Sequence, residues 1–438
     1  VPADWDGRRV VLAFQGVKSA FTVWVNGVEV GYSEDSYAPA EFDVTAAVAP
    51  GTNTVAVLVH RWSDGSWLEN QDQIDLSGIF REVELYATPL TYLDDHTVTT
   101  DVADDLASAT VTADLDVVGD PAAAVRATLH DADGAVVGEA AASAGALTID
   151  MPDARLWSAE DPYLYTLVYE VLDAGTVVET VATRVGIREF AIVDGLMTLN
   201  GAVLDIKGVN RGEMHPDVGQ AFTEELTRED LILMREHNIT AVRTSHYPAS
   251  PALYRLADEI GMYVMSEANL ETHIQRPFPD GAPEWDAAVL DRIDSMYERD
   301  KNHASVLWWS LGNEIGPGDV FAEAADRLRA TDATRLVHFQ EDSAVADVDG
   351  VFYPYLSTLE ERAAVTAGRP WIMTEYQHAL GASLGGIAEF WEVIDSSPEM
   401  QGGFVWDWAD QAIRLARPDG DGTYLSYGGD WGDYPSDG

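Results

Sequence analysis

Short stretches in which apolar and polar residues alternate fill the first ninety or so residues, among them FTVWV at 21–25 and TVAVLVH at 54–60. Asn26-Gly27 and Pro50-Gly51 separate such stretches. A period of two is typical of a strand with one buried face, and Asn-Gly between two such runs is a strong signal for a hairpin. We therefore expect an all-β first domain over residues 1–90.

The same spacing of strand-like runs continues from residue 91 to residue 190, with TVTADLDVV and YTLVYEVLDAGTVVETVATRVG as examples. Asp133-Gly134 and Ala174-Gly175 supply turns between them. Several short strands separated by turn residues predict a second all-β domain, built as a sandwich.

After residue 191 the rhythm changes, because strand-like runs alternate with helical ones. Eight runs have strand character: residues 203–209, 239–244, 262–267, 305–312, 335–339, 350–353, 371–375 and 402–408. Helical stretches fit residues 228–238, 251–260, 286–301, 319–330, 357–367 and 385–395. Thr227 and Asp230 form a candidate capping box for the first of these helices. The alternation predicts a (β/α)8 barrel over residues 191–438, less clearly helical after its first and eighth strands.

Polar and aromatic residues follow nearly every strand of the predicted barrel. The carboxyl ends of all the strands of such a barrel face one pocket, so these side chains should converge. The residues concerned are Arg243, His246, Glu267, Asn269, Glu271, His273, Asn313, Glu314, Tyr353, Glu375, Tyr376, His378, Trp406, Asp407 and Trp408. One such residue could merely close a strand with a hydrogen bond, but agreement at six strand ends predicts an active site.

Two glutamates in this set suit glycoside hydrolysis. Glu314 and Glu375 end the fourth and seventh strands, across the predicted barrel mouth from each other. Such a pair can flank a sugar, one carboxyl group protonating the leaving oxygen and the other attacking the anomeric carbon. Asn313 would hold a sugar hydroxyl. Trp406 and Trp408 offer flat apolar faces to a pyranose, although core filling is the alternative for both, and more so for Trp408.

Glu271 and His273 raise the possibility of a metal ion, since residues two apart on an extended segment point the same way. A hard cation such as magnesium takes carboxylate oxygens and waters. On spacing alone, a paired surface Glu and His is the favoured interpretation. The stretch Gly381-Ala382-Ser383-Leu384-Gly385 matches the GxSxG pattern of serine hydrolases, but no histidine follows His378 to serve such a serine.

Charge and composition narrow the partners. The 438 residues contain 75 Asp plus Glu and 26 Lys plus Arg, a net charge of −49. This balance argues against nucleic-acid and anionic-membrane partners. The chain contains no cysteine, which excludes disulfides and thiolate metal sites. We expect a cytoplasmic location, with secretion as the alternative. The start VPADWDGRRV has neither a Met nor a signal peptide, so we expect a fragment cut at its front.

Several motifs together resemble glycoside hydrolase family 2, and within it the β-galactosidases. They are SDGSWLENQDQIDLSGIFREVEL, VRTSHYP, EANLETH, SLGNEIG, TEYQHALG and GFVWDWADQ. The resemblance covers essentially the whole chain. It implies a jelly-roll sugar-binding domain, an immunoglobulin-like sandwich and a TIM-barrel catalytic domain, in that order. It also implies hydrolysis of β-galactosides with retention, with Glu314 as general acid/base and Glu375 as the nucleophile of a covalent galactosyl-enzyme.

The resemblance assigns further roles. It implies magnesium at Glu271, His273 and Glu314, and a carboxylate from the first domain, Asp72, that reaches the site and helps bind substrate and sodium. The implied substrate pocket consists of Asp72, Arg243, His246, Asn313, Tyr353, His378 and Trp406. The loop around residues 63–75 should therefore lean over the barrel.

The chain departs from the family pattern at Gly212. Gly212 stands where the family often has a sugar-contacting histidine. From the resemblance we also expect the remaining sodium ligands and the later β-domains to follow GDWGDYPSDG, where this sequence ends. A β-glucuronidase or β-mannosidase is the alternative within the family, with Lys207 and Arg211 as the nearby basic groups for a uronate. A noncatalytic carbohydrate-binding scaffold is the alternative outside the enzymes. A homo-oligomer is possible for the full-length protein.

Overall fold

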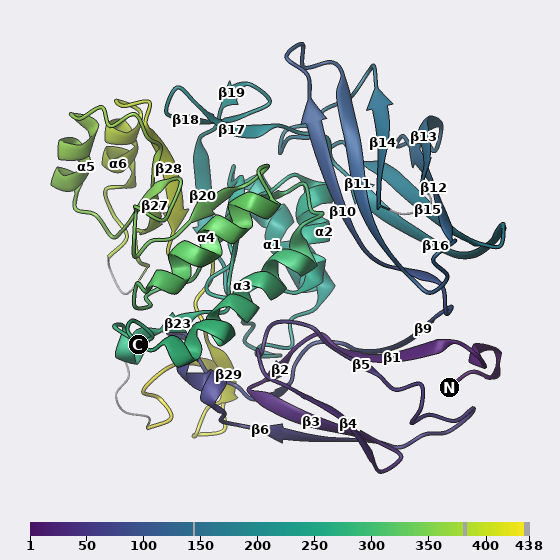
Figure 1. Ribbon diagram of the computed structural model, residues 1–438. Coiled ribbons are helices and arrows are strands. Elements are labelled where there is room, and N and C mark those ends of the chain that lie inside the picture. Colours follow the sequence, from purple (N-terminus) through teal and green to yellow (C-terminus); the bar gives the residue numbers. More distant parts are fainter. Residues whose placement is uncertain (143–144, 380–382, 433–438) are drawn as a thin grey trace.

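The structure is a computed structural model that describes residues 1–142, 145–379 and 383–432. Three parts follow one another along the chain (Figure 1). The first is drawn in purple, the second in blue, and the third, which carries the helices, in teal to yellow.

The first part is a jelly roll with three-stranded sheets in the orders β5-β1-β9 and β4-β3-β6. Its strands are β1 (Arg9–Phe14), β2 (Val17–Lys18), β3 (Ala20–Val25), β4 (Val28–Ser33), β5 (Ala40–Asp43), β6 (Val55–His60), β7 (Glu69–Asn70), β8 (Gly78–Ile79) and β9 (Val83–Thr88). Asn26 (φ 51°) and Gly27 (φ 82°) turn β3 into β4, which confirms the hairpin expected at this dipeptide.

The second part is an immunoglobulin-like sandwich of two sheets, in the orders β10-β11-β14 and β13-β12-β15-β16. Its strands are β10 (Tyr92–Val102), β11 (Ala109–Val118), β12 (Ala124–His130), β13 (Val136–Ala142), β14 (Gly145–Met151), β15 (Tyr165–Asp173) and β16 (Thr176–Val185). Alternate residues such as Val111, Ala113 and Leu167 are buried between the sheets, as the period of two predicts.

The third part is a barrel of eight parallel strands in the order β25-β24-β22-β21-β20-β28-β27-β26, with its seam between β25 and β26. The strands are β20 (Ile206–Asn210), β21 (Ala241–Arg243), β22 (Tyr263–Glu267), β24 (Val306–Ser310), β25 (Leu336–His338), β26 (Asp349–Phe352), β27 (Trp371–Tyr376) and β28 (Met400–Val405). All eight predicted strands are therefore present. Close packing requires glycine at Gly402 (φ 92°), where an added Cβ would lie 2.1 Å from the Ile206 carbonyl oxygen.

Helices cover the outside of the barrel. They are α1 (Glu224–Glu236), α2 (Pro251–Ile260), α3 (Asp286–Asp300), α4 (Asp319–Thr331), α5 (Leu356–Ala363) and α6 (Ile387–Ile394). A small sheet of β17 (Phe190–Val193), β18 (Leu196–Leu199) and β19 (Ala202–Val203) precedes the first barrel strand, and a hairpin of β29 (Ile413–Ala416) and β30 (Thr423–Ser426) follows the last.

The predicted start of the first helix is wrong. Helix α1 begins at Glu224, and its N-cap is Thr223, whose side chain accepts a hydrogen bond from the Leu226 amide. Thr227 lies inside the helix and donates its hydroxyl to the Thr223 carbonyl. Thr223 is favoured as the cap because two glutamates follow it, and acidic residues in a first turn complement the helix dipole.

Buried contacts fix the three parts to one another. Arg188, in the link between sandwich and barrel, is 4% exposed and donates to the carbonyl oxygens of Ala304 (2.8 Å) and Val306 (2.9 Å). Strand β7 of the jelly roll pairs in parallel with β23 (Glu271–Thr272), which follows barrel strand β22. The expectation that the loop around residues 63–75 leans over the barrel is therefore confirmed.

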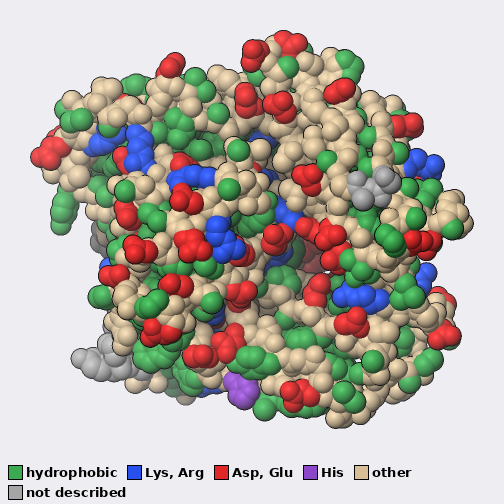
Figure 2. All heavy atoms as spheres, in the orientation of Figure 1, with side chains coloured by type: hydrophobic (Ala, Val, Ile, Leu, Met, Phe, Trp, Pro, Cys, Tyr) green, Lys and Arg blue, Asp and Glu red, His purple; other side chains and the backbone are tan. Residues whose placement is uncertain are grey.

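Acidic side chains are spread over the surface that Figure 2 shows. Two of the three lysines, Lys18 (5% exposed) and Lys301 (3%), are buried, so Lys207 is the exposed one. No helix in the described part of the chain is long and apolar enough to cross a membrane. Self-repulsion among so many like charges destabilises a compact state, and salt screens it.

We predict that salt stabilises the folded chain. Raising KCl from about 0.05 M to about 1 M should raise the midpoint of thermal unfolding by roughly 5 °C, since the Debye length falls from above 10 Å to about 3 Å. Differential scanning calorimetry measures the midpoint, with sorbitol of equal osmolality as the control. A midpoint that stays constant or falls in KCl would contradict this account of the surface.

Candidate active site

One buried guanidinium lies where five barrel strands end. Arg243, the last residue of β21, is 0% exposed. Its Nη1 donates to Asn210 Oδ1 (3.0 Å) at the end of β20 and to Glu375 Oε1 (2.8 Å) on β27. Its Nη2 donates to Asn313 Oδ1 (2.9 Å), and its Nε to Glu267 Oε2 (2.8 Å) at the end of β22. The predicted convergence of strand ends is thus built around one positive charge.

Glu375 is held at both carboxylate oxygens. Oε1 accepts from Arg243, and Oε2 accepts from the Tyr353 hydroxyl at 2.7 Å. Tyr353 follows β26 with φ 43°, an uncommon conformation for a bulky residue. Burial, with the nearby charge of Glu375, raises the pKa of this tyrosine, so it remains a hydrogen-bond donor. A nearly buried carboxylate with two fixed donors has a single orientation.

One wall of the site consists of ring side chains, those of His246, Tyr353, His378 and Trp406. Nδ1 of His246 lies 2.7 Å from Glu267 Oε1, and its ring stacks on Trp406, with centroids 5.0 Å apart. The His378 ring lies 5.8 Å from that of Tyr353 and 6.3 Å from that of Trp406. Burial would raise the pKa of Glu267, but the charges and hydrogen bonds of Arg243 and His246 lower it to about 2. Glu267 is therefore an anion that orients the other side chains.

Glu314 occupies a different environment from Glu375. Its side chain is 17% exposed, and its backbone φ is 41°. One carboxylate oxygen contacts His273 Nδ1, and the other lies 2.7 Å from Nη2 of Arg276. Burial would raise the pKa of Glu314, but the hydrogen bond and charge of His273, with the charge of Arg276, hold it below its ordinary value. Besides burial, the charges of Glu375 and Glu314 both raise the pKa of Tyr353.

The structure brings together the predicted magnesium ligands. Ligand atoms of Glu271, His273 and Glu314 all lie within 4.8 Å of one another. Glu271 is 0% exposed, and its Oε2 makes no hydrogen bond to the described residues. An orphaned buried carboxylate oxygen is costly unless a cation or a donor satisfies it. Two carboxylates and an imidazole therefore fit a hard divalent ion.

The jelly roll contributes a loop to this pocket. The Asp72 amide donates to Glu271 Oε1 (3.3 Å), and the Asp72 Oδ2 lies 3.9 Å from His273 Nε2. Gln71 donates to Asn269 Oδ1 (2.8 Å), and Asn269 donates to Asp35 Oδ1 (2.7 Å). Asp72 thus reaches the barrel mouth, as expected, with its carboxylate outside the cluster of three candidate ligands.

Other predicted residues lie elsewhere. The Trp408 indole N–H donates to Asp230 Oδ1 (2.9 Å), and the ring packs against the hydrophobic core. An added Cβ on Gly212 would meet its nearest atom, the Ser245 carbonyl oxygen, at 3.5 Å, so this position has room for a side chain. Lys207 lies over the Trp391 ring of helix α6, outside the barrel. In the GxSxG stretch, Gly381 and Ala382 lie outside the described residues.

Sequence reasoning did not select Asn210 and Arg276, and it named Glu267 and Asp407 at strand ends without giving either a role. Asn210 and Glu267 hold Arg243; Glu267 was visible as a strand-end residue, but its role depends on a contact that no pattern shows. Arg276 lies in a loop without periodicity. Asp407 has a pKa raised to about 6 by burial, with Asp410 and Glu375 adding to the effect.

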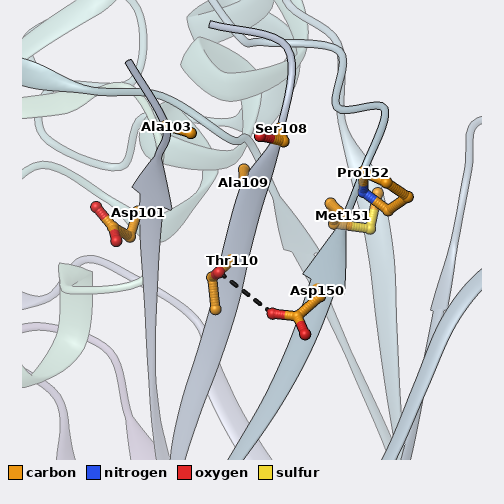
Figure 3. A pocket seen from close by; sticks show the side chains of 8 residues that line it. All are labelled: Asp101, Ala103, Ser108, Ala109, Thr110, Asp150, Met151 and Pro152. Atoms are coloured by element: carbon orange, nitrogen blue, oxygen red, sulfur yellow. Dashed lines mark hydrogen bonds between the residues drawn. The ribbon is translucent and has the colours of Figure 1, made fainter. Parts of the chain in front are cut away.

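A separate open groove of about 390 Å³ lies on the sandwich. Figure 3 shows it between β10, β11 and β14, with the Thr110 hydroxyl donating to Asp150 at 3.4 Å. Two aspartates, Asp101 and Asp150, line it together with Met151, Pro152 and smaller side chains. None of the predicted site residues belongs to this groove.

Fold and site together define a TIM-barrel protein with two β-domains before the barrel and paired carboxylates at its mouth. Residues 1–89 match the description "Glycosyl hydrolases family 2, sugar binding domain", residues 91–188 "Glycosyl hydrolases family 2", and residues 190–438 "Glycosyl hydrolases family 2, TIM barrel domain". The chain belongs to glycosyl hydrolase family 2.

Curated relatives include a β-galactosidase of Priestia megaterium, 42% identical over 466 positions that cover 100% of this chain and 45% of the relative. β-Galactosidases of Halalkalibacterium halodurans (100% of this chain, 45% of the relative) and Streptococcus thermophilus (98% and 46%) are each 41% identical. The chain spans about half the length of these relatives. A β-glucuronidase structure from Ruminococcus gnavus has TM-score 0.85 at 24% identity over 94% of this chain and 81% of that one, a likeness of fold.

We predict that Asp35→Asn stabilises the chain near neutral pH. Burial raises the pKa of Asp35 to about 6, so the carboxyl group favours folding below its unfolded pKa, and this contribution is lost as the pH rises through about 6. An asparagine keeps an oxygen acceptor for Asn269 without the buried charge. The variant should gain about 1–3 kcal/mol in free energy of unfolding at about pH 7.5 and much less at about pH 4.

Thermal unfolding of both proteins at the two pH values checks this prediction. Asp114→Asn, at an exposed position of β11, is the control and should shift the midpoint little at either pH. An Asp35→Asn variant that is destabilised equally at both pH values would contradict a raised pKa for Asp35, because a raised pKa makes the effect depend on pH.

Proposed function

We propose that the chain hydrolyses terminal β-D-galactosides by double displacement with retention. The observation that carries this proposal is that the two carboxylates at the barrel mouth, Glu314 and Glu375, differ in hydrogen bonding and in exposure to solvent. Glu375 is fixed at both oxygens, and the partly exposed Glu314 can exchange a proton with water. A fixed anion suits a nucleophile, and an accessible carboxyl group suits a general acid and base.

In the first step, a carboxylate oxygen of Glu375 attacks the anomeric carbon, and the bond from that carbon to the leaving oxygen breaks. Glu314 in its acid form gives its proton to that oxygen. In the second step, Glu314 takes a proton from water, whose oxygen attacks the anomeric carbon and releases Glu375. The first step inverts the anomeric centre and the second inverts it again, so the configuration is retained.

The remaining side chains would bind the sugar. His246, Asn313 and His378 offer polar atoms to sugar hydroxyls, and Trp406 offers an apolar ring face to the pyranose. Tyr353 donates to the Glu375 oxygen and can stabilise that carboxylate as it departs from the sugar. Asp72 adds a carboxylate at the rim, where it would also bind sodium.

Glu271, His273 and Glu314 would hold a magnesium ion, which when bound supplies a fixed positive charge beside the acid/base carboxylate. Two observations support this assignment. The ligand atoms of the three residues lie within 4.8 Å of one another, and the buried Glu271 Oε2 has no hydrogen-bond partner among the described residues.

Galactosides are proposed as substrates because the 41–42% identical relatives bear the name β-galactosidase. The β-glucuronidase alternative would need a cation near the sugar carboxylate. Lys207 lies outside the barrel, and Arg211 is 2% exposed with its Nε donating to Asp230 (2.9 Å). Neither residue favours a uronate.

We predict that the chain hydrolyses 4-nitrophenyl β-galactoside in preference to the β-glucuronide and β-mannoside. Glu314→Gln and Glu375→Gln should each lower kcat by roughly 1,000-fold or more, because each removes a reacting group. Glu170→Gln, on the sandwich, is the matched control and should leave kcat unchanged. Preferred turnover of the glucuronide would establish the alternative, and a folded chain inactive on all three glycosides would contradict the proposal.

Retention can be tested on the same reaction. Proton NMR during hydrolysis should show β-galactose first, with α-galactose appearing later through mutarotation. Initial release of α-galactose would mean a single displacement and would remove the nucleophilic role of Glu375.

A further inference from the structure

The positively charged side chain of Arg276 lies at the candidate metal site. It follows the 3₁₀ turn His273–Gln275, and its Nη2 lies 2.7 Å from Glu314 Oε1 and 3.5 Å from His273 Nδ1. These two residues are members of the cluster whose ligand atoms lie within 4.8 Å of one another. The guanidinium therefore contacts the side chains that would bind a divalent ion.

The surroundings of Arg276 are acidic on the pocket side and open on the other. Glu271 and Glu314 belong to the cluster, and the charges of Glu314 and Arg276 both act on the half-buried Glu341. The Arg276 side chain is 55% exposed. Its guanidinium can therefore be hydrated when it leaves Glu314.

A divalent ion and this guanidinium cannot share the cluster without repulsion. An ion bound to Glu314 and His273 would lie beside the guanidinium if Arg276 stayed in place, because Arg276 contacts both side chains. Repulsion between charges of +2 and +1 near the surface changes a binding constant by about three- to tenfold at moderate ionic strength.

We propose that Arg276 is a positioning residue that competes with the divalent ion for Glu314 and His273. Without the ion, the guanidinium neutralises Glu314 and fixes its orientation; with the ion bound, it moves toward solvent. This inference rests on the metal site given under the proposed function. The proposal predicts that the chain binds a divalent ion more weakly than Glu271, His273 and Glu314 would without Arg276. It also predicts that the hydrolytic activity depends less on that ion.

A binding titration with Mn²⁺ tests the competition without any substrate. Electron paramagnetic resonance measures the concentration of free Mn²⁺ at each point. Arg276→Ala should bind Mn²⁺ about three- to tenfold more tightly than the unchanged chain. Arg276→Lys keeps the charge on a shorter stem without the fork and should bind with intermediate affinity. Unchanged or weaker binding by Arg276→Ala would overturn the proposal.

Arg126→Ala is the matched control. Arg126 is 53% exposed and donates to Glu170 at 2.6 Å on the sandwich, so its removal deletes an equally exposed, glutamate-paired arginine away from the cluster. Its Mn²⁺ affinity should equal that of the unchanged chain. An increase equal to that of Arg276→Ala would mean that overall charge, and not competition for Glu314, sets the affinity.

Turnover in chelator gives an independent readout. With the metal removed, the unchanged chain should keep a several-fold higher kcat on nitrophenyl galactoside than Arg276→Ala, and added Mg²⁺ should abolish the difference. Equal loss in both proteins would contradict the role of Arg276 as a substitute cation.

Failure of the metal site is distinguishable from failure of the glycosidase assignment. Glu271→Gln should abolish Mn²⁺ binding while leaving Arg276 in place. If neither the unchanged chain nor Arg276→Ala binds Mn²⁺, the competition is refuted, whereas galactoside hydrolysis and its loss in Glu375→Gln stand on their own measurements.

Discussion

The buried charge of Arg243 is the constraint on which the site depends. This guanidinium, 0% exposed, bonds to side chains from the ends of β20, β22 and β27 and to Asn313 after β24. A buried cation is tolerated only when its donors are satisfied, and here two carboxylates and two amides satisfy them. The same bonds fix Glu375, so the requirement that stabilises the barrel mouth also orients the proposed nucleophile.

The jelly roll supplies part of the wall of the pocket at the barrel mouth. Strand β7 pairs with β23, and the following loop brings Gln71 and Asp72 beside Asn269 and Glu271. The interface includes buried charges such as Glu69, which accepts from Arg292 at 2.8 Å. A loop held by paired strands and buried ion pairs is a rigid wall, which pre-organisation of a binding pocket requires.

Much of this architecture is readable from the sequence, because burial imposes periodicity. The eight barrel strands are nearly continuous apolar runs, and their polar ends mark Arg243, Glu314 and Glu375. The resemblance to a family then added Asp72, which no periodicity connects with the barrel. Helix α1 begins one turn earlier than predicted, because local side-chain competition between Thr223 and Thr227 decides the cap.

Other features arise only in three dimensions. The ion pair of Arg276 with Glu314 joins residues far apart in sequence, and nothing in the loop around Arg276 signals it. The raised pKa values of Asp35 and Asp407 come chiefly from burial among neighbouring parts of the chain. Pairwise electrostatics depends on distances and solvent exclusion, and a linear pattern contains neither.

Covalent trapping identifies the residue that attacks the sugar. A 2-fluoro-galactoside with a good leaving group should inactivate the chain, and mass spectrometry of the digested protein should place one fluorogalactosyl group on Glu375. Glu375→Gln should remain unlabelled. A label on Glu314 or on any other residue of the digest would contradict the assignment of Glu375 as the nucleophile that Arg243 holds in place.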